Sequence, residues 1–161
     1  MTRVYFLRHG KAENRAEWRG SDDERPLTAE GEEAMRREAE ALRALGLAPD
    51  VIVTSPLARA RRTAEIVAEG LGLSGRLVED ERLAHGFDVR RLEQVLTAHA
   101  GAGAVMVVGH EPDFSAAVAE LIGGGEIVMK KGGLARVDVT APAAGGGELV
   151  WLLTPPLLGS R

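Results

Sequence analysis

Two histidines and two arginines of this chain each stand shortly after a brief apolar run. They are Arg8 and His9 after the first run, Arg59 after the second, and His110 after a later one. An imidazole can act as a nucleophile or exchange a proton, and a guanidinium offers forked donors to an anion. If the fold brings these four side chains together, they are suited to transferring a phosphoryl group.

The apolar runs are predicted to be buried strands, because they are short and rich in β-branched residues. Helical patterns follow them, with apolar residues three or four positions apart. The expected strands are Val4–Leu7, Val51–Val53, Leu77–Val78 and Ala104–Val108. The expected helices begin after a Thr28 cap, after a Ser55 cap with Pro56 at the first helical position, near Leu92, and near Phe114.

This alternation predicts an α/β protein, a three-layer α/β/α sandwich with a mainly parallel central sheet. Near the end of the chain, Leu134–Val139 and Glu148–Leu153 flank a glycine-rich turn. They are expected to form an antiparallel C-terminal edge. The carboxyl ends of parallel strands meet at one edge of such a sheet, so the two histidines and two arginines should converge there.

Composition narrows the class of protein. The 161 residues, 45% of them hydrophobic, suit a single domain spanning 1–161. The net charge of −4 argues against nucleic-acid binding. There is no cysteine, no run long enough to span a membrane and no signal-peptide pattern, so we expect a cytoplasmic protein without membrane contact. We expect it to be a monomer or a weak dimer.

Three motifs carry a resemblance to a known family. Arg8-His9-Gly10, SPLARARRTA from Ser55, and Gly109-His110-Glu111-Pro112 resemble, in this order, the histidine phosphatase superfamily with its phosphoglycerate mutase-like fold. The stretches DDERPLTAEG and KKGGLARVDV are most similar to SixA-type phosphohistidine phosphatases. The resemblance implies a hydrolase that acts on phosphohistidine, and it covers almost the whole chain.

The same resemblance implies roles for five residues. His9 would be the nucleophile, Arg8 and Arg59 would bind the phosphate, and His110 would be a second donor to the transferring group. Arg25 matches a further basic residue of the SixA-type site. Taken singly, each could instead be an ion-pair partner or a structural residue at a strand end.

The chemistry of the residues agrees with these roles. His9 must attack as a neutral imidazole, and neighbouring arginine charges should lower its pKa. Arg59 falls in the first turn of its helix, where free amides favour an anion. No His-Glu-x-x-His motif or aspartate cluster is present, and the arginines would repel a cation, so we expect neither metal nor cofactor.

The identity of a general acid stays open. Glu79 and Glu81 are candidates without a clear motif, His85 could approach the site from a loop, and His99 fits a structural role on a helix. Without a strong acid, a phosphohistidine is a better substrate than an alkyl phosphate, because imidazole leaves phosphorus more readily. The expected partner is thus a phosphorylated protein. The alternatives are a small phosphate ester and, for a protein without catalytic activity, simple phosphate binding.

Overall fold

The computed structural model describes residues 1–158, which are built around one six-stranded sheet in the order β3-β2-β4-β1-β5-β6. Four strands run parallel: β1 (Thr2–Arg8), β2 (Val51–Thr54), β3 (Leu77–Glu79) and β4 (Ala104–Gly109). The antiparallel pair β5 (Leu134–Val139) and β6 (Gly147–Leu153) lies on the far side of β1. The mainly parallel sheet with an antiparallel C-terminal edge is confirmed.

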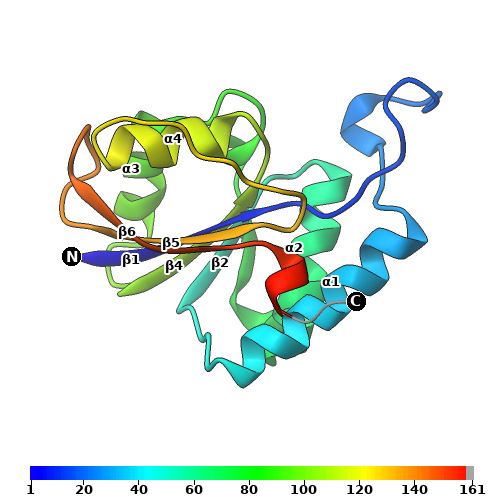
Figure 1. The fold of residues 1–161 in the computed structure, drawn as a ribbon, viewed down its shortest axis with the longest axis horizontal. Helices are drawn as coiled ribbons and strands as arrows, with labels where there is room; N and C mark the ends of the chain where they lie inside the picture. Colours follow the sequence, from blue (N-terminus) through cyan, green and yellow to red (C-terminus); the bar gives the residue numbers. More distant parts are fainter. Residues whose placement is uncertain (159–161) are drawn as a thin grey trace.

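Helices cover both faces of the sheet. The helices α1 (Ala29–Ala44) and α2 (Ala58–Leu71) lie on one face, and α3 (Val89–Ala98) and α4 (Asp113–Leu121) lie on the other (Figure 1). The three-layer α/β/α arrangement is therefore as predicted. Within residues 1–158, none of the helices has the length and apolarity that crossing a bilayer requires.

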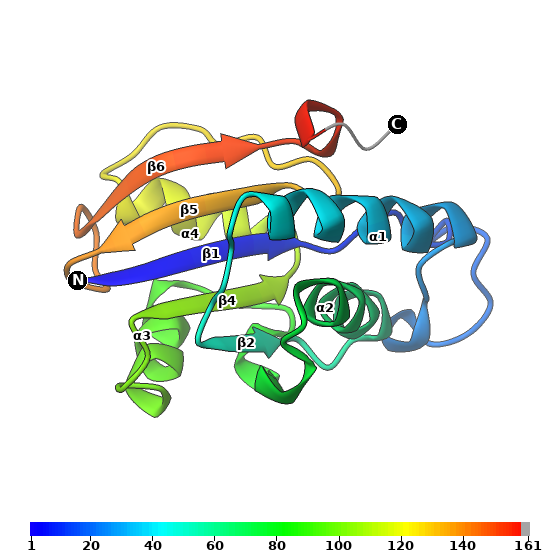
Figure 2. The same cartoon turned by 90° about the horizontal axis from the view of Figure 1, so that it is seen from below.

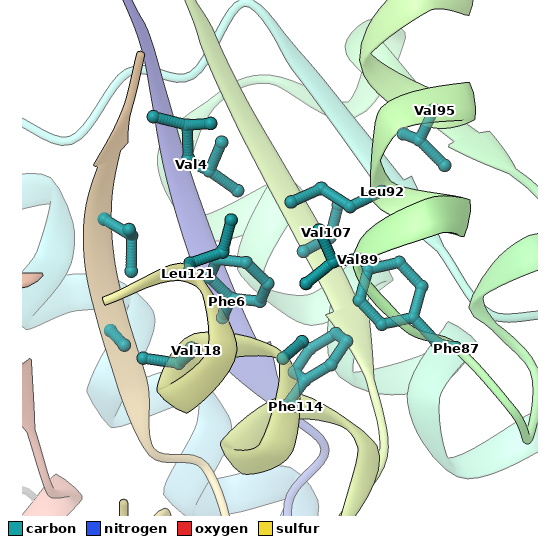
Figure 3. Packing of buried hydrophobic residues seen from close by; sticks show 14 of the residues in the cluster. Val4, Phe6, Phe87, Val89, Leu92, Val95, Val107, Phe114, Val118 and Leu121 are labelled. Atoms are coloured by element: carbon teal, nitrogen blue, oxygen red, sulfur yellow. The ribbon is translucent and has the colours of Figure 1, made fainter. Parts of the chain in front are cut away.

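The central strand β1 is buried on both faces, so its side chains alternate between two cores. Phe6 enters the core beneath α3 and α4, where its ring meets Phe114 edge-on at 5.4 Å between centroids (Figure 3). Phe87 packs on the other edge of Phe114, also at 5.4 Å. Leu7 enters the opposite core, against residues of α1 and α2 such as Met35.

The start of α1 follows the sequence prediction and the start of α2 does not. The Thr28 hydroxyl accepts a hydrogen bond from the Gly31 amide at 2.9 Å, as an N-cap should. The helix α2 begins only at Ala58, so the assignment of Ser55 as cap and Pro56 as first helical residue is wrong. The buried Ser55 hydroxyl accepts a hydrogen bond from the Leu57 amide at 3.2 Å, in the turn that precedes the helix, and it also pairs with His110 in the site described below.

The ends of the parallel strands set the position of the site. Figure 2 shows the arrows of β1, β2 and β4 pointing to the same edge of the sheet. The segments that follow these strands carry the arginines and histidines that the sequence singled out.

Candidate active site

A cavity of about 300 Å³ lies at this edge and collects all five predicted site residues. Its lining comprises Arg8, His9, Arg25, Arg59 and His110, together with Ala12, Glu13, Asn14, Arg15, His85, Glu111 and Lys131. The two histidines and two arginines predicted to converge on one edge, His9, His110, Arg8 and Arg59, do lie together there.

The backbone around His9 is held by its neighbours in the sheet. The His9 amide donates to the Gly109 carbonyl at 3.1 Å, and its own carbonyl accepts from Gly132 at 3.1 Å. The next residue must be small, because a Cβ on Gly10 would lie 2.9 Å from the Met35 side chain. Gly10 thereby lets α1 pack directly against the turn that presents His9.

The ring of His9 is neutral and oriented. Its Nδ1 lies 2.8 Å from the Gly10 carbonyl, which can only accept a hydrogen bond, so Nδ1 carries the hydrogen and Nε2 keeps a free lone pair. Burial lowers the pKa of His9 to about 4, with the charges of Arg59, Arg8 and Arg25 acting in the same direction against the Gly10 hydrogen bond. His9 is therefore an unprotonated nitrogen base at neutral pH.

His110 faces His9, with 5.4 Å between the ring centroids. Its Nε2 lies 2.8 Å from the Ser55 hydroxyl, and its buried Nδ1 has no partner in the described part of the chain. Burial lowers the pKa of His110 to about 3, and electrostatic interactions with His9, Arg59 and His85 act in the same direction, against that with Asp22. When the Ser55 hydroxyl donates to Nε2, the Nδ1–H is left to bind a ligand in the cavity.

Three arginines surround the two histidines and are anchored on one side. Arg59 is almost fully buried and donates to the Asp22 carbonyl at 2.7 Å and to its carboxylate at 3.1 Å. Arg25 donates to the same carboxylate at 3.0 Å, and Arg8 donates to the Met129 carbonyl at 2.8 Å. These bonds fix the guanidinium groups in place before any ligand arrives.

Asp22, in the 3-10 helix Asp22–Glu24, is the carboxylate that organises this cluster. Partial burial opposes its charge, yet hydrogen bonds and charge from Arg25 and Arg59 lower its pKa to about 2. Asp22 was not singled out from the sequence, although it lies three residues before Arg25 in the DDER segment. The single negative charge of Asp22 faces the positive charges of both Arg25 and Arg59, so the cavity keeps a net positive charge.

Among residues 1–158, three buried nitrogens of this cavity lack a hydrogen-bond partner: Arg8 Nε, Arg59 Nε and His110 Nδ1. An unsatisfied buried donor costs on the order of 1–3 kcal/mol. A tetrahedral anion in the cavity would supply the missing acceptors. The donor set is therefore that of an anion site built around His9.

Glu79 and Glu81, the two carboxylates considered as candidates for a general acid, lie elsewhere. Glu79 is half exposed and pairs with Arg61 at 3.8 Å, and neither Glu79 nor Glu81 lines the cavity. His85 does line it, as does Lys131 from the exposed Lys130-Lys131 segment. His99 ends α3, away from the cavity. Within residues 1–158, no group of three or more His, Asp or Glu side chains is arranged to hold a metal ion.

Comparison with known proteins agrees with this geometry. The family model of the histidine phosphatase superfamily (branch 1) matches residues 4–86. The chain belongs to the histidine phosphatase superfamily. The matched part contains the elements that carry Arg8, His9, Arg25 and Arg59.

Proteins of similar sequence match this chain to different extents. An uncharacterised protein of Picosynechococcus sp. is 37% identical over 161 residues, which is 95% of this chain and 96% of that protein. A protein assigned as phosphoglycerate mutase GpmB in Klebsiella pneumoniae is 46% identical over 85 residues. This second match covers 52% of this chain and only 37% of the mutase.

Two solved structures are similar to this chain over almost its whole length. The protein histidine phosphatase SixA complexed with tungstate superimposes with a TM-score of 0.85 at 29% identity, over 98% of this chain and 99% of that chain. A protein from Agrobacterium tumefaciens assigned as phosphohistidine phosphatase SixA gives 0.79 at 26% identity, over 96% and 98%. The fold and the family are those of histidine phosphatases close to SixA, which supports a phosphatase activity.

Proposed function

We propose that this protein removes phosphoryl groups from phosphohistidine on other proteins, through a phosphohistidine intermediate on His9. The observation that carries the proposal is the unprotonated Nε2 of His9 in a cavity with three unpartnered donors. This arrangement presents a nucleophile beside positive charge that can stabilise a transferring phosphoryl group.

The reaction has two halves. In the first, His9 Nε2 bonds to phosphorus as the bond to the leaving group breaks, and Arg8, Arg59 and His110 bind the equatorial oxygens. In the second, a water oxygen bonds to phosphorus and the bond to His9 breaks, which releases phosphate and the original imidazole. The Gly10 carbonyl holds His9 in the required tautomer throughout.

Two observations support a protein substrate. The structures with TM-scores of 0.85 and 0.79 are both described as SixA phosphatases of histidine or phosphohistidine. Next to the phosphate cavity, a groove of about 470 Å³ extends past Trp18 and Pro112. A groove beside the reactive centre leaves room for the polypeptide on either side of a modified residue.

The second candidate is a small phosphate monoester. It is favoured by the 46% identity to GpmB, although the match covers only 52% of this chain and 37% of that protein. A higher kcat/KM for a small phosphate ester than for a phosphohistidine protein would select this candidate.

The proposal is tested by offering the purified protein phosphohistidine carrier proteins, phosphoserine peptides and sugar phosphates in parallel. The first should be hydrolysed with the highest kcat/KM. Acid-labile, alkali-stable phosphate should be trapped on His9 during turnover. His9→Ala should abolish both signals, while His99→Ala, outside the cavity, should not. Phosphate binding without any turnover would indicate a binding module and refute the proposal.

A further inference from the structure

His85 lies in the loop between β3 and α3 and forms part of the wall of the phosphate cavity. Its ring centroid is 4.9 Å from that of His110. Its Nε2 lies 3.4 Å from Arg59 Nη2 and 3.7 Å from Asp22 Oδ2. Its side chain is 52% exposed, whereas His9 and His110 are buried. His85 therefore stands where the cavity opens to solvent.

The loop that carries His85 is held from both ends. Leu83, two residues before, is fully buried in the core beneath α3 and α4. The amide of Gly86 donates to the Asp113 carboxylate at 3.0 Å, and Arg91 donates to the His85 carbonyl at 3.3 Å. The imidazole is thus placed at the cavity by the packing of its loop.

This placement has a consequence for the reaction proposed above. In-line displacement puts the leaving atom on the side of phosphorus opposite the attacking nitrogen. Since His9 attacks from the buried side, the leaving group must point toward the opening, where His85 lies. We propose, resting on the proposed function, that His85 is a further catalytic residue that donates the proton to the leaving group.

The step balances as follows. His9 Nε2 bonds to phosphorus, and the electron pair of the breaking bond stays on the leaving nitrogen or oxygen, which takes a proton from the His85 imidazolium. Neutral His85 then removes a proton from the water that attacks the phosphorylated His9, and both groups return to their starting states. An imidazole suits both directions, because it gains and loses a proton readily near neutrality.

The charges around His85 fit this cycle. The Asp22 carboxylate lies 3.7 Å from His85 Nε2. The Arg59 guanidinium lies 3.4 Å from the same nitrogen. His85 Nε2 thus lies near the negative Asp22 side chain and the positive Arg59 side chain. Asp22 and Arg59 are hydrogen-bonded to each other.

Two carboxylates of the cavity lining are the competitors for this role, Glu13 and Glu111. Glu111 already accepts a hydrogen bond from the Ser115 amide at 2.8 Å in the first turn of α4. Glu13 is exposed, and its contact with the cluster is made by its backbone carbonyl to Arg25. The charge of Glu111 acts on Arg8, whereas the His85 side chain contacts both Arg59 and Asp22.

The test is leaving-group dependence in kcat/KM, which reports phosphoryl transfer to His9 and not its later hydrolysis. Phenyl phosphate needs acid assistance and 2,4-dinitrophenyl phosphate does not. We expect His85→Gln to lower kcat/KM for phenyl phosphate about 100-fold or more, the usual range for a lost general acid. The value for the dinitrophenyl ester should fall by less than about 5-fold, since its leaving group is stable without a proton.

Several outcomes would overturn the assignment. An equal loss for both esters would make His85 a positioning residue for Arg59, and unchanged values would remove it from the reaction. A selective loss for phenyl phosphate in Glu13→Gln or Glu111→Gln, and not in His85→Gln, would transfer the role. His85→Asn provides a second variant should His85→Gln fold poorly. If the unaltered protein hydrolyses neither ester nor phosphohistidine, or carries no phosphate on His9, the proposed function itself fails.

Discussion

Glu38 is a buried carboxyl group whose protonation can be tested by its effect on stability. It lies on the inner face of α1, is fully buried, and neither carboxylate oxygen has a partner within residues 1–158. Gly132, whose amide donates to the His9 carbonyl, packs closely against Glu38. A Cβ on Gly132 would lie 2.9 Å from Glu38 Oε1. Burial raises the pKa of Glu38 from 4.5 to about 8. The carboxyl is thus protonated in the folded protein at neutral pH.

The sign of the effect on stability follows from linkage. Below pH 4.5 the group is protonated in both the folded and unfolded states. Between pH 4.5 and about 8 only the folded state keeps the proton, so stability falls as the pH rises and levels off above the folded pKa. Each pH unit in this window costs about 1.4 kcal/mol, which gives an upper estimate of about 5 kcal/mol in all.

The measurement is the free energy of unfolding in urea from pH 5 to pH 8, for the unaltered protein and for Glu38→Gln. The substituted amide does not titrate, and the contributions of other groups cancel in the difference. The stability difference between the two proteins should therefore move by about 3.5 kcal/mol in favour of Glu38→Gln across this range. Glu40→Gln, an exposed neighbour on α1, serves as the control. Parallel curves for the unaltered protein and Glu38→Gln would refute the assignment of a protonated buried carboxyl.

Three further predictions concern the cavity. In an NMR titration the His9 ring should stay neutral down to about pH 5 and titrate near pH 4, and a midpoint above 6 would contradict its burial among arginines. Ser55→Ala should lower kcat on the order of ten-fold with little change in KM, because it removes the hydroxyl that orients the His110 ring. As a control, Ser74→Ala at an exposed serine should leave kcat unaltered. Vanadate and tungstate should inhibit competitively and protect against thermal unfolding, with Arg59→Ala weakening inhibition at least ten-fold. Inhibition unaffected by Arg59→Ala would place the anion elsewhere.

Much of the architecture can be predicted from the sequence, because it depends on local patterns of residues. The runs at Val4, Val51 and Ala104 are apolar on both faces, and only strands buried beneath helices on either side can accept them. The Thr28 cap marks the start of α1 through short-range chemistry. Parallel strand order then brings His9, Arg59 and His110 to one edge.

What the sequence could not determine depends on contacts between distant segments. Ser55-Pro56 has the local pattern of a helix start, but α2 begins only at Ala58. The pairing of the Ser55 hydroxyl with His110, 55 residues away, has no local sequence signal. In the sequence, nothing distinguishes Asp22 from the other acidic residues. In the structure, its carboxylate accepts hydrogen bonds from both Arg25 and Arg59. His85, and not Glu79 or Glu81, reaches the cavity, because the path of its loop is set by packing. The residue types that can move a phosphoryl group were evident from the sequence, while their hydrogen-bond partners, their protonation and the identity of the group nearest the opening were decided only by tertiary structure.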